Sequence, residues 1–353
     1  MNFSHSMVHV LGHPVLPLDL QACPEDAQLR NCWNFCLLLE HLGIPCKYYG
    51  ISGSKTPPGC EFVDCGRPAG RWRYRNAWHQ RYNRRLSRAL SRHCLADGRP
   101  EWIASLYGAA QSDIDDTALP VLEPMLGYDH CWCHYRVFPS YAQQQVIYTR
   151  QAEFTWQSRF FDTVIPHFLP PAEYPFSSTH DGYLLYLGRD AQDKGLDLAR
   201  TCADDCGLPL RLVFSGCQGQ EKAALLGRAL AVLMPTLYLE PFGYVAIEAQ
   251  MCGTPVVCTD WGAFPETVAA GLSGFRCRTA AEFRAAAVQC PRLDRAAIRE
   301  RALSLYSLPV AAQLYADYLT FVWEVHNHGG YYAPAALRRG GLSPQPQLSK
   351  PRN

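Results

Sequence analysis

The feature that most constrains this fold is an alternation of strand-like and helix-like segments that occurs twice along the chain. The first run begins with an apolar strand at Met7–Leu11, and Ala27–His41 then carries apolar side chains at helical spacing. Gly43 ends this helix, and residues 44–50 form the next expected strand. A strand–helix–strand start predicts a βαβ unit and therefore a parallel sheet.

The second run predicts another parallel sheet. Its expected strands are residues 182–187, 210–215, 231–235 and 256–259, and its expected helices are residues 195–206, 221–229 and 242–251. Between the two runs, residues 76–93 and 135–148 are expected to be helical, with strands at 101–108 and 121–126. Helices are expected again at residues 283–289, 296–305 and 310–326.

A proline-rich segment separates the two runs. Residues 161–176 contain Pro166, Pro170, Pro171 and Pro175, so this segment is expected to be extended and stiff. We therefore predict an α/β chain of two Rossmann-like domains, residues 1–165 and 166–308, followed by a disordered tail at 335–353. Ligands of such sheets bind outside the carboxyl ends of the strands, which predicts a site in a cleft between the domains.

Composition excludes several classes of protein. The 353 residues are 48% hydrophobic and 18% charged with a net charge of +1, so no strong overall field selects nucleic acid or an anionic membrane. No apolar run reaches the ~18 residues of a membrane span. The first residues lack the basic region and the following apolar region of a signal peptide, so a secretory signal is not expected. The sixteen cysteines are scattered through apolar segments, which indicates reduced thiols and a cytoplasmic location.

Two glutamates in the second run indicate chemistry. Glu240 and Glu248 flank a Pro-Phe-Gly-Tyr-Val-Ala-Ile segment in which a helix begins near Gly243. The free N–H groups of a helix N-terminus suit an anionic phosphate, and Gly243 lets a ligand approach the backbone. Glu248 lies among apolar residues and needs a partner, for which a sugar or ribose hydroxyl would serve. The alternative is a surface Glu248 and a Glu240 that pairs with arginine.

A basic pair lies in the same predicted domain. Gly188 and Arg189 end a strand, and Lys194 comes just before the following helix. Two cations on one such loop can clamp a diphosphate, while the other loop supplies carboxylates for hydroxyl groups. A nucleotide-sugar carries both a diphosphate and hydroxyl groups, so it would satisfy both loops.

These motifs resemble those of the retaining glycosyltransferases of family 4, which have the GT-B fold. Glu240–Glu248 is similar to the family's E-x7-E signature, and residues 249–266 continue the similarity. Gly188-Arg189 and Lys194-Gly195 resemble its G-R-x4-K-G element. Short segments near Gly12, Arg136 and Pro166 resemble a subgroup with viral and bacterial members.

The resemblance implies an acceptor-side first domain, a donor-binding second domain, and a final helix at 309–330 that crosses back to pack on the first. It implies catalytic roles for Glu240, Arg189, Lys194 and His130. It implies donor contacts from Gly188, Phe242, Gly243, Tyr244, Val245, Glu248, Gly12 and His13. In this family Glu240 would contact the transferred sugar, Glu248 the ribose, and the basic pair the diphosphate.

The implied reaction retains the anomeric configuration and uses no metal and no cofactor other than the nucleotide-sugar substrate. One departure concerns the loop after the first strand, which reads Gly12-His13-Pro14 where many members have two glycines that touch the donor phosphate. For His13 and His130, an ordinary surface or core histidine is the alternative to a functional one.

An arginine-rich stretch in the first domain is a candidate acceptor site. Residues 66–93 carry nine arginines and no acid, interleaved with aromatic residues. Arg81, Arg84, Arg85 and Arg88 are the residues expected to bind a nucleic acid, an acidic glycan or a lipid head group. A glycan is the default acceptor of the reaction, and a DNA base or a protein stays open. A solvated basic helix is the alternative. Two other functions also stay open at this point: a nucleotide-sugar 2-epimerase and a non-catalytic sugar-nucleotide-binding subunit.

Overall fold

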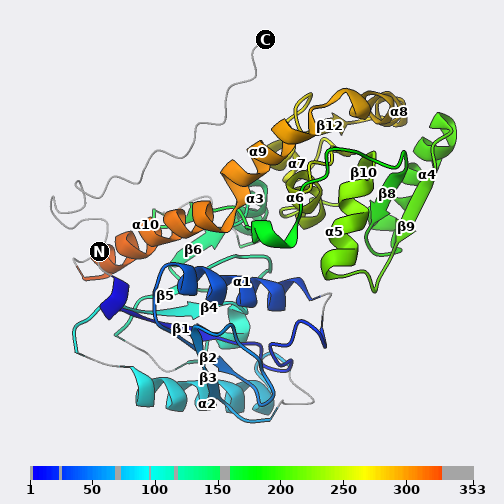
Figure 1. Cartoon of the computed structure of the whole chain (residues 1–353). Helices are drawn as coiled ribbons and strands as arrows, with labels where there is room; N and C mark the ends of the chain where they lie inside the picture. Colours follow the sequence, from blue (N-terminus) through cyan, green and yellow to red (C-terminus); the bar gives the residue numbers. More distant parts are fainter. Residues whose placement is uncertain are drawn as a thin grey trace. The chain divides into compact units, whose positions relative to one another are not determined.

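The computed structural model describes residues 3–23, 26–67, 73–94, 97–114, 118–151 and 160–327 (Figure 1). The predicted disordered tail at 335–353 lies outside these residues. The chain forms two compact units. The first unit contains the chain up to Val137, a short segment that ends at Thr163, and the chain from Ala312. The second contains a segment that begins at Phe138, and Val164–Ala311.

The first sheet has seven strands in the order β3-β2-β1-β4-β5-β6-β7. Their bounds are β1 Met7–Leu11, β2 Cys46–Gly50, β3 Cys60–Asp64, β4 Glu101–Ser105, β5 Val121–Glu123, β6 Tyr135–Phe138 and β7 Thr163–Val164. The neighbouring strands in the series β3-β2-β1-β4-β5-β6 all pair in parallel. Because the strand order turns back between β1 and β4, the switch point of this sheet lies at the carboxyl ends of those two strands.

The helices of the first part of the chain are α1 Ala27–His41, α2 Ala77–His93 and α3 Tyr141–Arg150, with 3-10 turns η1 Phe3–His5 and η2 Gly108–Gln111. Helix α1 begins where the Asp26 carboxylate accepts hydrogen bonds from the backbone N–H groups of Gln28 and Leu29, both at 2.9 Å. Its apolar face, which includes Phe35 and Leu39, is fully buried. This face anchors the helix on the sheet and explains why the sequence pattern predicted it correctly.

The last helix, α10 (Leu308–Asn327), belongs to the first unit from Ala312 onward. The Tyr315 hydroxyl accepts a hydrogen bond from the backbone N–H of Met125 at 3.1 Å, and the Tyr318 hydroxyl donates to the Phe161 carbonyl at 2.8 Å. The Trp323 ring lies 5.7 Å from that of Trp102, centroid to centroid. Aromatic side chains on this helix therefore complete the core of the first unit.

The second sheet has five parallel strands in the order β12-β11-β10-β8-β9. Their bounds are β8 Leu184–Leu187, β9 Leu210–Val213, β10 Ala231–Met234, β11 Val256–Thr259 and β12 Gly274–Cys277. The strand order reverses between β8 and β10, so a ligand of this sheet is expected outside the carboxyl ends of those two strands.

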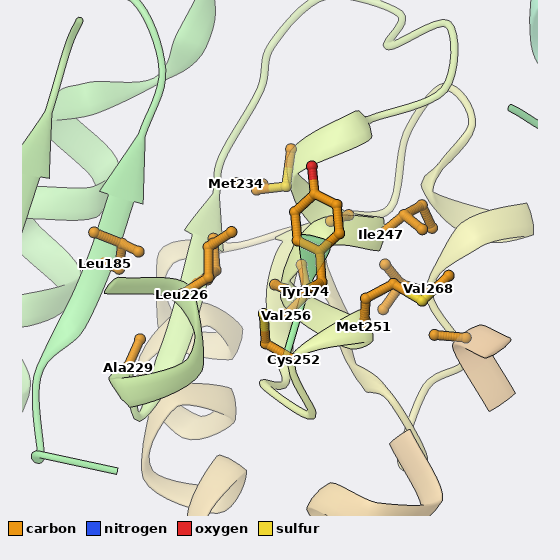
Figure 2. Packing of buried hydrophobic residues seen from close by; sticks show 14 of the residues in the cluster. Tyr174, Leu185, Leu226, Ala229, Met234, Ile247, Met251, Cys252, Val256 and Val268 are labelled. Atoms are coloured by element: carbon orange, nitrogen blue, oxygen red, sulfur yellow. The ribbon is translucent and has the colours of Figure 1, made fainter. Parts of the chain in front are cut away.

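The helices of the second unit are α4 Leu196–Cys206, α5 Gly219–Arg228, α6 Tyr244–Met251, α7 Phe264–Thr267, α8 Ala280–Gln289 and α9 Arg295–Tyr306, with 3-10 turns η3 Pro171–Glu173, η4 Gln192–Lys194 and η5 Cys290–Arg292. One core cluster of this unit joins β8, β10, α5 and α6 (Figure 2). Figure 2 shows Tyr174 beside Met234, Leu226 and Ile247, so the segment before β8 is part of this core.

The sequence prediction was wrong at residues 135–148, which are not one helix. Residues up to Phe138 form β6, and α3 begins only at Tyr141. Pro139 lacks an N–H group and Ser140 acts as the N-cap, its hydroxyl accepting from the Gln143 N–H at 2.9 Å. The expected strand at 101–108 ends at Ser105, and the edge strands β3 and β12 were missed.

The predicted fold class is confirmed, because both sheets are parallel Rossmann-like sheets flanked by helices. In the described part of the chain, no helix has the length and apolar character that a membrane crossing requires. The cytoplasmic location and the domain boundaries stay predictions.

Candidate functional site

Two loops meet at the switch point of the second sheet. The loop after β8 contains Gly188 and Arg189 and ends at Gly195, and the loop after β10 runs on from Pro235. Gly195 has a left-handed backbone (φ +70°), and a Cβ atom there would lie 2.1 Å from the Pro235 carbonyl oxygen. The N–H of Leu237 donates to the Asp193 carbonyl at 2.8 Å. A side chain at position 195 would therefore force the two loops apart.

Lys194, Tyr238 and Glu240 form one charged cluster on these loops. The Lys194 ammonium lies 3.1 Å from the Glu240 carboxylate, and the Tyr238 hydroxyl donates to that carboxylate at 2.8 Å. The Lys194 ammonium also lies 4.6 Å from the centre of the Tyr238 ring. Burial, and then the nearby charge of Glu240, raise the pKa of Tyr238, so its phenol stays protonated and donates to the carboxylate. The sequence predicted Lys194 and Glu240 but missed Tyr238.

Arg189 differs from Lys194 because its side chain is 69% exposed. Its guanidinium lies 3.6 Å from the Asp193 carboxylate, and an exposed pair at that distance contributes little stability. The side chain is therefore able to turn toward an anion at small energetic cost.

The N-terminus of α6 lies next to this cluster. Gly243 precedes the helix with a left-handed backbone (φ +84°), and a Cβ there would come within 2.9 Å of the Phe264 ring. Having no side chain, Gly243 leaves the first turn of the helix, Tyr244 and Val245, uncapped by its N-cap residue. Such a turn presents N–H groups and partial positive charge to an anion.

His167, which the sequence analysis did not single out, packs against the first turn of α6 through the Tyr244 ring. Its ring stacks on Tyr244 with centroids 5.0 Å apart and an interplanar angle of 5°, and it meets the Phe242 ring edge-on at 5.0 Å. Burial lowers the pKa of His167 to about 3, so the ring is neutral. The position of the histidine inside the proline-rich segment gave no signal of this contact.

Glu248 lies on α6, five residues after Gly243 and so about 7.5 Å along the helix. It is buried, and the Lys222 ammonium lies 2.7 Å from Oε1 and 2.6 Å from Oε2. The Tyr174 hydroxyl donates to Oε1 at 2.9 Å. The contact at Oε2 lacks hydrogen-bond geometry, so that oxygen is paired by charge alone. The partner that the sequence analysis required is therefore Lys222 on α5, which the sequence analysis did not single out.

Helix α3 contacts the same loops through its N-terminus. The Ser140 hydroxyl donates to the Pro241 carbonyl at 2.6 Å. The Glu266 carboxylate accepts from the backbone N–H groups of Tyr141 at 2.8 Å and Ala142 at 2.9 Å. Burial raises the pKa of Glu266, and these two hydrogen bonds oppose that shift. In this structure Glu266 caps a helix.

Gly12 and His13 lie at the switch point of the first sheet, after β1. Gly12 donates its N–H to the Tyr49 carbonyl at 2.9 Å, so that N–H is not available to a ligand. The His13 Nδ1 atom accepts from the N–H groups of Val15 at 2.9 Å and Leu16 at 2.7 Å. Burial lowers the pKa of His13 to about 4. The ring is therefore neutral, with its proton on Nε2.

His130 is also in the first unit, on the loop after β5. It is exposed and has a left-handed backbone (φ +64°), and its carbonyl accepts from the Ala109 N–H at 2.9 Å. The loop therefore holds the backbone of His130, while the imidazole stays at the surface.

The four candidate acceptor arginines, Arg81, Arg84, Arg85 and Arg88, are exposed on α2. The Arg81 guanidinium lies 4.8 Å from the centre of the Trp78 ring. Within the described ranges, none of the four forms an ion pair with a carboxylate. Part of the arginine-rich stretch, residues 68–72, lies outside the description.

Two groups of potential metal ligands occur among the described residues, and both are in the first unit. One is Cys36, Cys46 and Cys60, and the other is His9, Cys94 and Glu101. Neither group contains a residue of the loops after β8 and β10.

Comparison with known proteins agrees with this geometry. Residues 194–288 match the family model of the group 1 glycosyl transferases, a range that includes Lys194, Glu240 and Glu248. A glycogen synthase from Mycobacterium tuberculosis is 31% identical over 221 residues, which are 53% of this chain and 51% of that protein. A D-inositol 3-phosphate glycosyltransferase from Mycolicibacterium smegmatis is 43% identical over 72 residues, 20% of this chain and 17% of that protein. The chain thus spans about half the length of the glycogen synthase and 17% of the length of the inositol-phosphate glycosyltransferase.

Solved structures share the fold over most of the chain. A glycosyltransferase involved in avilamycin A biosynthesis superposes with a TM-score of 0.65 at 20% identity, covering 90% of this chain and 98% of that one. Sucrose-phosphate synthase from Thermosynechococcus elongatus gives 0.64 at 16% identity, with 89% and 99% covered. An Anabaena protein solved with UDP and glucose gives 0.58 at 12% identity, with 90% and 100% covered.

The fold is therefore that of the GT-B glycosyltransferases. The residues that match the group 1 glycosyl transferase model, 194–288, all lie in the second unit.

Proposed function

We propose that this protein is a retaining glycosyltransferase that takes its sugar from a nucleotide-diphosphate donor and needs no catalytic metal. The observation that supports this most strongly is the gathering of Lys194, Glu240 and the N-terminus of α6 at the switch point of the second sheet. Cations, a helix N-terminus and carboxylates are the three kinds of group that a sugar diphosphate needs.

The donor diphosphate would lie against the N–H groups at the start of α6, with Gly188 and Gly243 leaving space for it. Lys194 and the exposed guanidinium of Arg189 would neutralise the charge that grows on the diphosphate as the glycosidic bond breaks. This charge stabilisation is the task that a divalent metal performs in other phosphate chemistry, which is why the basic pair supports a metal-independent reaction.

The two glutamates would bind hydroxyl groups on either side of the phosphates. Glu240 would contact the transferred sugar, where its negative charge also favours an oxocarbenium-like transition state. Glu248 would hold the nucleotide ribose. Its pairing with Lys222 and Tyr174 orients the carboxylate but leaves Oε2 without a hydrogen bond, and a ribose hydroxyl is a suitable donor for that oxygen.

The predicted first domain, residues 1–165, would bind the acceptor. The predicted second domain, residues 166–308, would bind the donor. His13 carries its proton on Nε2 and would donate to a donor oxygen, and His130 would contact the transferred sugar. Gly12 would contribute space rather than a hydrogen bond, because its N–H is already engaged. The acceptor itself would be a glycan held in part by Arg81, Arg84, Arg85 and Arg88.

A donor-hydrolysis screen across UDP-, GDP- and ADP-sugars tests the proposal. UDP-glucose is the first donor to try, because the Anabaena protein of similar fold was solved with UDP and glucose. We expect slow release of free nucleotide from one donor class, and loss of this release in Glu240→Gln but not in Glu300→Gln, a matched change on the exposed side of α9. Full activity in Glu240→Gln would contradict the catalytic assignment.

The same screen distinguishes a glycosyltransferase from a nucleotide-sugar 2-epimerase and from a non-catalytic sugar-nucleotide-binding subunit. A 2-epimerase converts the donor to its C2 epimer without any acceptor, which NMR of the sugar detects. A non-catalytic subunit binds the nucleotide-sugar and leaves it intact under all conditions. The two carboxylates and the basic pair, all four in the second unit, favour an enzyme over a non-catalytic subunit.

A further inference from the structure

Three cysteines from separate elements meet in the core of the first unit, away from every residue in the proposed reaction. Cys36 is on α1, Cys46 is the first residue of β2, and Cys60 is the first residue of β3. Cys46 and Cys60 are direct partners in the parallel register. All three side chains are buried, and their sulfur atoms lie within 4.8 Å of one another.

The sulfur spacing is compatible with a shared metal ion. The Cys36 and Cys60 Sγ atoms are 3.7 Å apart. Two thiolates on a tetrahedral zinc ion, with Zn–S bonds of about 2.3 Å, are separated by about 3.8 Å.

The acidic residue considered as a fourth ligand is Glu40, an exposed residue whose carboxylate oxygens do not lie within 4.8 Å of all three sulfur atoms and would have to turn toward them. Glu40 lies one helical turn after Cys36 on α1, and Gly59 immediately precedes Cys60. A Cβ on Gly59 would lie 2.9 Å from the Glu40 carboxyl carbon, so the carboxyl group rests on a position that has no side chain. Zinc accepts carboxylate oxygen beside thiolate sulfur, whereas Cu⁺ prefers sulfur alone.

We propose that Cys36, Cys46 and Cys60 form a structural zinc site, with Glu40 or a water molecule as the fourth ligand. Binding converts three thiols and Zn²⁺ into a zinc trithiolate and releases three protons. The site lies at the amino ends of β2 and β3, whereas ligands of the sheet bind at the carboxyl ends, so the ion has no part in transfer. It would join α1 to two strands, as a disulfide does in an oxidised protein.

This inference goes beyond the proposed function and is tested without it. Metal-free protein is prepared under reducing conditions and titrated with Zn²⁺ and, separately, with Co²⁺, whose thiolate charge-transfer absorption reports sulfur ligands. We expect one ion per chain, proton release, a rise in melting temperature, and protection of three thiols from alkylation. Donor hydrolysis by the second unit is measured in parallel, and its failure would not bear on this site.

Variants assign the ligands. Cys46→Ser is expected to weaken zinc binding at least about 100-fold, and Glu40→Gln about 10-fold. Cys258→Ser is the matched control, since Cys258 is equally buried in β11 of the second unit. If Cys46→Ser does not fold, the wild-type stoichiometry still decides the question. Absence of stoichiometric zinc in the wild type, equal loss in Cys258→Ser, or binding of Cu⁺ without Zn²⁺ would overturn the proposal.

Discussion

Replacement of Lys222 by methionine removes the cation that faces the buried carboxylate of Glu248. The two charges are 2.6 to 2.7 Å apart, and the exposed fractions of the side chains are 17% for Lys222 and 7% for Glu248. Methionine keeps most of the side-chain volume, so the change acts on charge. Removing one partner of a buried ion pair costs about 3–5 kcal/mol, because the other charge is left buried without compensation.

Two features of the structure reduce that cost. Lys222 is partly exposed, so water reaches the edge of the pair, and the Tyr174 hydroxyl still donates to Glu248. We therefore expect Lys222→Met to lower the free energy of unfolding by about 2–3 kcal/mol. Glu248→Gln is expected to cost about 1–2 kcal/mol, because the lysine that remains is better solvated. The double variant, in which neither position 222 nor position 248 carries a charge, is expected to be about 2 kcal/mol more stable than the sum of the single changes predicts.

Urea unfolding of the wild type, both single variants and the double variant measures this coupling. Lys47→Met is a suitable control, because Lys47 pairs with an exposed glutamate, Glu61, in the first unit. Additive effects in the cycle, or a Lys222→Met variant as stable as wild type, would refute the reasoning that Lys222 compensates Glu248.

Three further predictions follow from single contacts. Gly195→Ala is expected to lower the free energy of unfolding by at least about 2 kcal/mol, because its Cβ would meet the Pro235 carbonyl. Gly207 has a similar φ and no atom within 4 Å of a built Cβ, so Gly207→Ala is expected to cost only about 1 kcal/mol. Equal losses in calorimetry would contradict this. The buried neutral ring of His167 has a pKa of about 3 when folded against about 6.5 when unfolded, so the unfolded state binds more protons between those values. Stability should therefore fall as pH drops below about 6.5, by up to ~1.4 kcal/mol per unit, and a His167→Phe variant with the same pH slope would argue against this cause. Glu266→Gln weakens the cap on α3 and is expected to cost about 1 kcal/mol in thermal unfolding; an unchanged melting temperature would show that the cap contributes nothing.

The fold was largely predictable because its elements carry strong local patterns. Met7–Leu11, Ala27–His41 and Val256–Thr259 have the bounds that periodicity and glycine signals indicated. The edge strands β3 and β12 are short and partly exposed, so their sequences lack the apolar run that identifies a central strand. Residues 135–148 were assigned to one helix because their apolar residues fit helical spacing, and the break at Pro139-Ser140 was overlooked.

Candidate site residues could be named from the sequence only where they share a short motif. Arg189, Lys194, Glu240 and Glu248 lie in two segments, and the structure places each at the ends of β8 and β10 or on α6. Tyr238, His167, Tyr174 and Lys222 come from three different segments, and their contacts are encoded by no spacing in the sequence. The same is true of Cys36, Cys46 and Cys60, whose proximity depends on strand register and helix packing.

The central claim is that a nucleotide-diphosphate sugar binds at the loops after β8 and β10. Calorimetric titration of the wild type and Lys194→Met with the donor found by the hydrolysis screen, and with the free nucleotide diphosphate, tests it most directly. Arg200→Gln is the control, because Arg200 is an exposed α4 residue 3.9 Å from its nearest carboxylate, that of Asp197. The account predicts that Lys194→Met weakens binding of both ligands about 30-fold while Arg200→Gln leaves it unchanged. Wild-type affinity in Lys194→Met would contradict it.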